Sequence, residues 1–244
     1  MFERQIRECM ARTGAGFEAL VYESVGSTNT ELARLAREGT AEYTAVIAQA
    51  QTAGRGRGEH SFFSPRGSGV YFSLLLRPRF PAETAAKLIT PAAAVAAARA
   101  IEAVSGRNAR IKWVNDIFVG GKKACGILTE AEAGANGRLN WAIPGIGINV
   151  SEPEGGYPGE LSGTAGAVFE SEAPESAAAM LVVLTIENLV GLYEAMPSCG
   201  FRDEYARRLI MDERAQGRVV GIDEDFRLLL KGRDGELVAL DSMA

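Results

Sequence analysis

Strand-like and helix-like segments follow one another irregularly along this 244-residue chain. Apolar segments typical of strands, at 17–24, 43–51 and 70–77, are separated by one helical segment and one glycine-rich segment. A hairpin signal follows at Gly120-Gly121, between two further apolar segments. A doubly wound parallel sheet needs a helix after each strand, whereas hairpins join antiparallel strands. The order therefore predicts an α+β fold with a mixed, mostly antiparallel sheet packed with helices.

Hydrophobic periodicity and capping residues place the remaining elements. Helices are expected at 1–13, 27–37, 81–105, 175–195 and 201–211. In the third of these, Thr90-Pro91 is typical of an N-cap and first helical residue, so we expect the helix to restart there. Further strands are expected at 110–113, 117–119, 124–130 and 138–150. After Gln216 the pattern changes to short strands and turns, which predicts domains at 1–205 and 206–244, the second a small β module.

Composition excludes several classes of protein. Hydrophobic residues make up 47% of the chain and charged residues 23%, as in ordinary globular proteins. The start MFERQIRE lacks the apolar core of a signal peptide, and the longest apolar segment, 177–186, is shorter than the ~20 residues of a membrane span. We therefore expect a cytoplasmic protein without membrane contact. Scattered Cys9, Cys125 and Cys199 and the single His60 disfavour a disulfide framework, a zinc site or a Ser-His-Asp triad.

Charge is distributed unevenly along the chain. Residues 1–138 carry 18 Lys or Arg and 13 Asp or Glu, whereas residues 139–201 carry eight Glu and no Lys or Arg. Residues 202–244 carry eight basic and ten acidic residues, and the whole chain has a net charge of −5. The negative total argues against bulk nucleic-acid binding. The basic excess near the glycine-rich segment favours a small anionic ligand.

Glycine and arginine alternate at 54–58, in the order GRGRG. Glycine lets backbone N–H groups approach an anion, and arginine adds a permanent charge with a planar fork of donors. The spacing matches neither a Walker loop nor a GxGxxG dinucleotide fingerprint. The segment therefore indicates an anion-binding loop, with a flexible basic loop that binds no ligand as the alternative.

Polar residues and glycines also interrupt three later strand-like segments. The segment 111–117, IKWVNDI, places a cation, an amide and a carboxylate at the end of a short strand. The segment 121–128, GKKACGIL, places lysines before a strand that contains glycine, and 144–150, PGIGINV, alternates glycines on one strand face. Taken singly, a turn, a solvated hairpin tip or a bulge explains each of them.

Together these segments closely resemble the biotin–protein ligases. That family has an STN segment, a GRGR loop, a KWPND turn, a lysine before a GIL strand, and a GIGIN strand. The matching segments here, in the same order, are Ser27-Thr28-Asn29, Gly54–Arg57, Lys112–Ile117, Lys123–Leu128 and Gly145–Asn149. The resemblance is strongest over residues 20–150 and returns at 217–230, which looks like the family's small C-terminal barrel.

The resemblance implies a class II synthetase-like catalytic domain at 1–205, followed by a shortened, barrel-like module. It implies an enzyme that activates biotin with ATP to biotinyl-5′-adenylate. The biotin would then pass to a lysine of a biotin carboxyl carrier protein, as in acetyl-CoA carboxylase. Mg²⁺ is the expected cofactor, without assigned metal ligands. The oligomeric state stays open, with a homodimer as one option.

The resemblance also implies roles for individual residues. Those expected to act in catalysis are Lys123, Arg55, Lys112 and Asp116. Those expected to bind biotin are Ser27, Thr28, Asn29, Gln51, Gly54, Arg55, Lys123, Gly126 and Gly147. Those expected to bind ATP or the adenylate are Arg55, Arg57, Lys112, Asn115, Lys123 and Asn149.

The chain departs from the family pattern at two places. Glu59 and His60 stand where a glycine and a basic residue are common, and Val114 replaces the usual proline. We therefore expect a loop that holds the adenylate less firmly and a looser turn at Val114.

Three alternatives to a biotin ligase follow from the same residues. A lipoate–protein ligase or octanoyltransferase shares the architecture but is not expected to carry both GRGR and KWxND. A non-catalytic biotin-binding module would not need Lys123, Arg55 and Asp116. A DNA-binding regulator would need a further domain, and residues 1–16 before the first strand are too few for one, so we expect no DNA partner.

Overall fold

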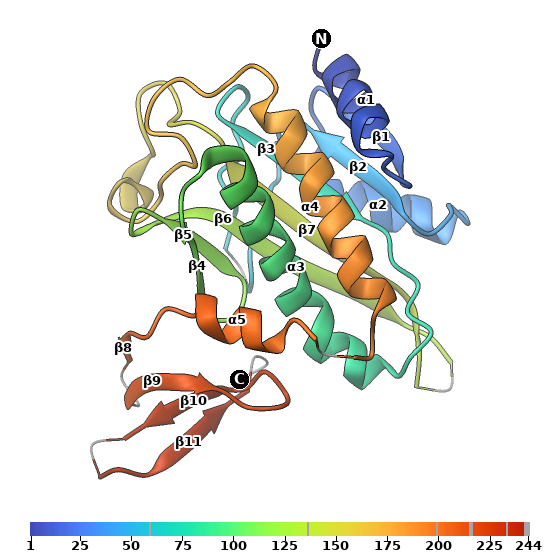
Figure 1. Cartoon of the computed structure of the whole chain (residues 1–244). Coiled ribbons are helices and arrows are strands. Elements are labelled where there is room, and N and C mark those ends of the chain that lie inside the picture. Colours follow the sequence, from blue (N-terminus) through green and yellow to red (C-terminus); the bar gives the residue numbers. More distant parts are fainter. Residues whose placement is uncertain (59, 136, 199, 215–216, 233, 242–244) are drawn as a thin grey trace.

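The computed structural model describes residues 1–58, 60–135, 137–198, 200–214, 217–232 and 234–241. A seven-stranded sheet, in the order β1-β2-β3-β7-β6-β5-β4, forms its centre (Figure 1). Its strands are β1 Glu18–Tyr22, β2 Thr44–Ala48, β3 Gly69–Leu74, β4 Ala109–Lys112, β5 Asp116–Val119, β6 Lys122–Ala133 and β7 Leu139–Asn149. The helices are α1 Phe2–Thr13, α2 Thr28–Arg37, α3 Ala82–Ser105, α4 Ala177–Glu194 and α5 Arg202–Arg208, with a 3-10 helix at Gly159–Gly163.

The sheet confirms the expected mixed, mostly antiparallel topology. Strands β1 and β2 are parallel and α2 connects them, while the other neighbouring pairs are antiparallel. The hairpin expected at Gly120-Gly121 joins β5 to β6, and both glycines have positive φ angles of 58° and 81°. A turn with positive φ at successive positions suits glycine because it carries no Cβ.

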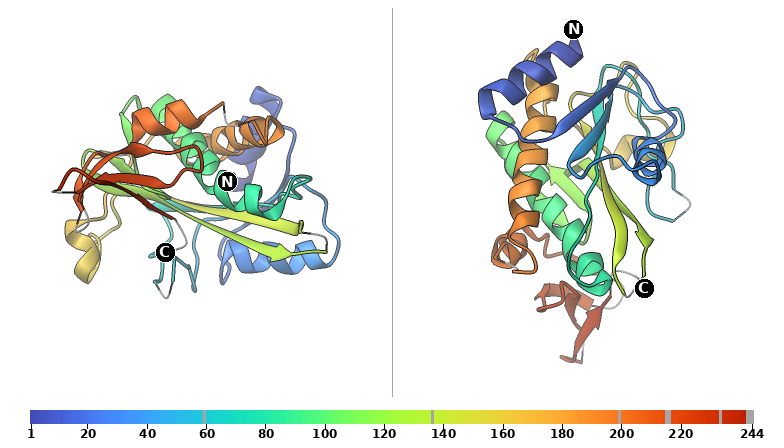
Figure 2. Two further views of the ribbon diagram at one scale, coloured as in Figure 1. Left: turned by 90° about the horizontal axis from the view of Figure 1, so that it is seen from below. Right: turned by 90° about the vertical axis from the view of Figure 1, so that its right-hand side faces the viewer.

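Helices cover the two faces of the sheet unequally. Figure 2 shows α3 and α4 on one face of the sheet and α2 on the other. The larger face is buried by a core of alanines and branched aliphatic residues, and a smaller core around Leu32, Val46 and Trp141 lies beneath α2. Two long helices therefore cover most of one face, while part of the other stays open beside α2.

The expected restart of the third helix at Pro91 is wrong. Helix α3 runs without a break from Ala82 to Ser105 with Pro91 inside it. Proline removes one backbone hydrogen bond from a helix interior. Burial compensates for this loss, since the residues from Pro91 to Ala98 are all buried. Helices α3 and α4 are long and apolar enough to span a membrane by length and composition alone, but here they pack into the protein core.

The last helix is shorter than the expected segment 201–211. Helix α5 ends at Arg208, and Leu209 is extended, with a ψ angle of 136°. The chain then follows β4, because Leu209 forms a parallel bridge with Ile111 and Ile210 N donates to the Ile111 carbonyl at 2.8 Å. Pairing with the edge of the sheet therefore ends the helix, a long-range contact that helical periodicity does not reveal.

The expected C-terminal β module is a four-stranded antiparallel sheet in the order β11-β10-β9-β8. Its strands are β8 Glu213–Arg214, β9 Gly217–Ile222, β10 Leu228–Lys231 and β11 Leu237–Leu240. The turn residue Phe226 stacks on Phe201 at 5.4 Å between ring centroids and meets the edge of Tyr205. Trp113 Nε1 donates to the Phe226 carbonyl at 2.8 Å. Aromatic contacts thus hold this sheet against the rest of the protein, and the division at 205/206 stays a prediction.

An ion-pair network connects α5 to α3. Glu204 bonds Arg99 on α3 at 2.5 Å and Arg208 at 2.9 Å, and Arg208 also pairs with Glu102 at 2.8 Å. The hydrogen bond from Arg99 is the main reason that the pKa of Glu204 lies below its usual value. The ionised carboxylate of Glu204 therefore stabilises the docking of α5.

Glu204→Gln is expected to lower the free energy of unfolding by about 1–2 kcal/mol at neutral pH, because it weakens charge-assisted bonds to two arginines. The pKa of Glu204 is lower in the folded state than in the unfolded state. Its stabilisation is therefore present above the unfolded-state pKa and is lost as the pH falls through the folded-state pKa. Urea unfolding should show the difference in unfolding free energy from wild type narrowing as the pH falls below the ordinary glutamate pKa. Substitution of the exposed neighbour Asp203 by Asn is the control. A loss of unfolding free energy in Glu204→Gln that does not change with pH would contradict the role given to the ionised Glu204 carboxylate.

Candidate functional site

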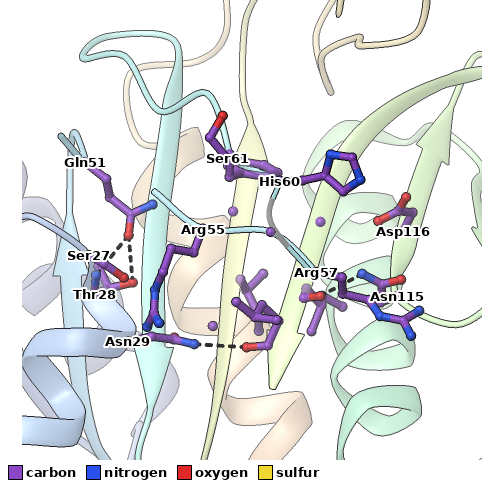
Figure 3. Close-up of a pocket in the computed structure, with 18 of the residues that line it drawn as sticks. Ser27, Thr28, Asn29, Gln51, Arg55, Arg57, His60, Ser61, Asn115 and Asp116 are labelled. Atoms are coloured by element: carbon purple, nitrogen blue, oxygen red, sulfur yellow. Dashed lines mark hydrogen bonds between the residues drawn. The ribbon is translucent and has the colours of Figure 1, made fainter. Parts of the chain in front are cut away.

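A cavity of about 270 Å³ opens on the sheet face that α2 leaves partly uncovered. Strands β6 and β7 form its floor, the start of α2 and Gln51 form one wall, and residues 55–57 and 60–62 lie over it (Figure 3). The sequence-predicted residues that line it are Ser27, Thr28, Asn29, Gln51, Arg55, Arg57, Asn115, Asp116, Lys123, Gly126 and Gly147. The fold thus brings together residues that lie up to 120 positions apart in the sequence.

The floor of the cavity is made by glycines on paired strands. Gly126 on β6 lies opposite Gly147 on β7, and Gly145 lies opposite Leu128. The ring of Phe62 rests on this floor, and a Cβ atom at Gly147 would come within 2.5 Å of the ring. A Cβ at Gly126 would be 2.8 Å from the same ring. Glycine is therefore required at both positions for an aromatic or flat group to lie against the strands.

A buried polar wall stands at the start of α2. Gln51 Oε1 accepts hydrogen bonds from Thr28 N at 2.9 Å and Thr28 Oγ1 at 3.2 Å. Ser73 Oγ lies 2.8 Å from Thr28 Oγ1 and 2.6 Å from Asn29 Oδ1. Ser27 is the N-cap of α2, and its side chain accepts from Thr30 N. The wall is neutral and rich in donors and acceptors, which suits a neutral polar ligand group.

The glycine–arginine segment folds as a narrow hairpin over the cavity. Arg55 and Ser61 form an antiparallel bridge, and Gly56 N donates to the His60 carbonyl at 2.7 Å. Gly54 lies at its base, where a Cβ would come within 2.5 Å of the Phe62 carbonyl oxygen. Gly54 therefore permits the hairpin rather than lining the cavity. His60 lines the cavity, while the expectation about Glu59 lies outside the described residues.

Two cations of the cavity are held by carboxylates of β5 and β6. Arg55 Nη2 lies 2.5 Å from Glu130 Oε2, and Lys123 Nζ lies 2.7 Å from Asp116 Oδ1. Figure 3 shows Arg55 pointing toward Asn29, with Asp116 on the opposite side of the cavity. Both cations keep partly exposed side chains. The cavity therefore offers cationic donors on two sides to an anionic ligand.

Besides Gly54, two predicted residues lie outside the described cavity lining. Lys112 is exposed and its ammonium lies 5.7 Å from the centroid of the Phe118 ring. Asn149 lies on the same face of β7 as Gly147 but further along, and its amide donates to the Gly166 carbonyl at 2.9 Å. Asn149 therefore connects the floor to the segment that follows the 3-10 helix.

The turn at Val114 is well anchored. Val114 is buried, and its carbonyl accepts a hydrogen bond from Tyr205 at 3.1 Å. Asn115 Nδ2 donates to the Ile127 carbonyl at 2.8 Å, so this turn is tied to β6.

Sequence reasoning missed Glu130 and Ser73. Glu130 lies on β6, two residues after Leu128 and four after Gly126. Because side chains alternate between the two faces of a strand, Glu130 is on the same face as these two cavity residues. Ser73 is the one polar residue in the buried segment VYFSL, and it is fully buried. A lone polar residue inside a buried strand is a signal that a hydrogen-bonded site lies nearby.

The side chains of the cavity could hold a metal ion only together with a bound phosphate-containing substrate. Among the described residues, no group of three or more His, Cys, Asp or Glu side chains is arranged to hold a metal ion. Asp116 is the only carboxylate among the described residues that line the cavity. Mg²⁺ is usually bound by one or two carboxylates plus substrate phosphates and water, and this arrangement fits that mode.

Comparisons with known proteins place the chain in a family. Residues 21–149 match the family described as "Biotin/lipoate A/B protein ligase family". The bifunctional ligase/repressor BirA of Bacillus spizizenii is 33% identical over 246 residues, which covers 96% of this chain and 75% of that protein. The biotin–[acetyl-CoA-carboxylase] ligase of Paracoccus denitrificans is 35% identical over 156 residues, 60% of this chain and 63% of that protein.

A solved structure has the same fold. The biotin protein ligase from Aquifex aeolicus, in complex with biotin and ATP, has a TM-score of 0.75 at 23% identity, covering 91% of this chain and 95% of that one. The family match at residues 21–149 includes every residue that lines the cavity. This chain belongs to the biotin/lipoate A/B protein ligase family.

Proposed function

We propose that this protein activates biotin with ATP to biotinyl-5′-adenylate and then transfers biotin to a lysine of a biotin carboxyl carrier protein. The observation that carries the proposal is one cavity that joins a neutral polar wall, a glycine floor and two flanking cations. A ligand with a neutral polar head, a flat body and a terminal carboxylate fits the cavity, because these parts match the polar wall, the glycine floor and the cations in turn. A relative named as a biotin–[acetyl-CoA-carboxylase] ligase favours biotin over lipoate or octanoate.

The polar wall binds the ureido head of biotin in this proposal. Thr28 and Gln51 offer a hydroxyl and an amide, and Ser27 stands beside them at the helix start. Burial of this wall makes an unpaired polar group costly, which favours a head that satisfies it and disfavours an apolar one. The bicycle and tail then lie on Gly126 and Gly147.

The cations serve the adenylation step. A carboxylate oxygen of biotin attacks the α-phosphorus of ATP, the bond to the leaving phosphate breaks, and pyrophosphate departs. Two anions must approach one another, so Arg55, Arg57 and Lys123 lower the barrier by neutralising charge that the reactants bring together. Mg²⁺, carried in with ATP, would share this task, and Asp116 and Asn115 would hold it through their side-chain oxygens.

Transfer needs a neutral acceptor amine. Asp116 lies on the cavity side opposite the polar wall and is paired with Lys123, so it is placed to accept a proton from the acceptor lysine. The amine then attacks the acyl carbon, the acyl–phosphate bond breaks, and AMP leaves. Lys112 and Asn149 lie further out, and we propose that they contact the nucleotide beyond the cavity. We also propose that the reaction takes place in the cytoplasm.

Exchange of labelled pyrophosphate into ATP tests the adenylation step directly. Exchange is expected with biotin and Mg²⁺, because pyrophosphate release is reversible while the adenylate stays bound. Lipoate at the same concentration should give no exchange, since its dithiolane head cannot satisfy the polar wall. Exchange with lipoate and none with biotin would reverse the substrate assignment.

Lys123→Ala is expected to reduce the exchange rate by about tenfold to a hundredfold, because it removes a charge-assisted bond of roughly 1.5–3 kcal/mol. The adjacent Lys122 is a matched control. It is exposed, and its Cβ faces Gly166 rather than the cavity. Lys122→Ala should therefore stay within about twofold of wild type, a limit of ~0.4 kcal/mol. A larger loss in Lys122→Ala than in Lys123→Ala would show that the wrong lysine has been assigned.

A further inference from the structure

Glu130 on β6 contacts two residues of the proposed site at once. Its Oε2 atom accepts a hydrogen bond from Asn29 Nδ2 at 2.8 Å and pairs with Arg55 Nη2 at 2.5 Å. Asn29 belongs to the start of α2, whereas Arg55 belongs to the hairpin over the cavity. One carboxylate oxygen therefore ties the hairpin to the sheet and to α2.

The same contact continues into the polar wall. Asn29 Nδ2 also donates to the Leu128 carbonyl at 3.1 Å, and Asn29 Oδ1 lies 2.6 Å from Ser73 Oγ. Ser73 Oγ reaches Thr28 Oγ1 at 2.8 Å, and Thr28 bonds Gln51. A serine hydroxyl has a single proton, so Ser73 donates to only one of its two neighbours at a time. Glu130 thus stands at the end of a polar chain that joins the head-binding wall to Arg55.

Arg55 needs such a tether because its backbone is flanked by glycines. Gly54 and Gly56 give the hairpin a high conformational entropy when it is free. An arginine carries five N–H donors, and the contact with Glu130 uses Nη2 only. Within the part of the chain that the structure describes, the remaining donors have no partner and are available to a ligand, and the side chain of Arg55 is 44% exposed.

We propose that Glu130 is a positioning residue that holds the Arg55 guanidinium against Asn29 and so presents its free donors to the reacting carboxylate and phosphate. This inference rests on the proposed adenylation of biotin. It assigns to Glu130 no contact with the ligand and no proton transfer. Its effect on the reaction runs through Arg55.

The competing explanation is that the Arg55–Glu130 ion pair only stabilises the fold. The exposure of the pair distinguishes this explanation from a positioning role. Ion pairs as exposed as Arg55 and Glu130, whose side chains are 44% and 31% exposed, contribute little to folding stability. Removing the charge of Glu130 should therefore leave the thermal midpoint within about 2 °C of wild type. The catalytic rate should nevertheless fall, because a loosened guanidinium loses its orientation.

The test compares Glu130→Gln, Arg55→Gln and the double variant in biotin-dependent pyrophosphate exchange. Glu130→Gln is expected to lower kcat by about fivefold, because part of a charge-assisted contact is lost. The KM for biotin should stay within about twofold of wild type. The double variant should be no slower than Arg55→Gln alone, because Glu130 acts only through Arg55. Glu132→Gln is the matched control: Glu132 also lies on β6 and pairs with an arginine, Arg37, at 2.9 Å.

A signal from the arginine itself provides a readout that does not depend on activity. The Nε–H resonance of Arg55, assigned by its loss in Arg55→Gln, should be sharp in wild type and broadened in Glu130→Gln. An unchanged resonance, additive losses in the double variant, or a large drop in thermal midpoint would overturn the positioning role. Absence of biotin-dependent exchange in wild type would count against the proposed function instead, and the resonance would still decide whether Glu130 tethers Arg55.

Discussion

The close pairing of glycines on β6 and β7 is the constraint around which the site is built. Gly126 faces Gly147 across the two strands, so a patch of the sheet has backbone but no side chains on its open face. The Phe62 ring fills part of this patch at contact distance, and the Asn29 amide packs against Gly145. Any Cβ there would displace the ring or the amide. The hairpin and the start of α2 can meet over the sheet only because this floor is bare.

Charge balance is the second organising feature of the site. Each of two cations, Arg55 and Lys123, is held by a carboxylate from the sheet, Glu130 and Asp116 respectively. Without a ligand, the positive charges that line the cavity would repel one another. The ion pairs reduce this repulsion and leave other N–H donors of the cations available to a ligand. An anionic ligand can then share or replace the carboxylates. Because the pairs lie on opposite sides of the cavity, they can act on two different anionic groups.

Local patterns were enough to place most helices, strands and hairpins, and they failed where distant contacts decide. Period-two and helical spacing, with glycine turns, predicted the sheet elements within a few residues. The break expected at Pro91 does not occur, because burial against α4 and the sheet outweighs one lost hydrogen bond. The last helix ends early because Leu209 pairs with Ile111. Both errors come from contacts that are invisible in a local window.

The sequence alone indicated the chemistry of the site. Guanidinium and ammonium groups and glycines that expose the backbone suit an anionic ligand by residue type, and a carboxylate suits a cation or a proton. Which of these groups share a cavity was decided by the folded sheet. The pairing of Gly126 with Gly147 sets which face of β6 and β7 looks toward the cavity, and it brings Glu130 into the site. Lys112 lies on the edge strand β4, outside the cavity lining. The physical reason is that residue type determines what a side chain can bind, whereas strand register determines where it points.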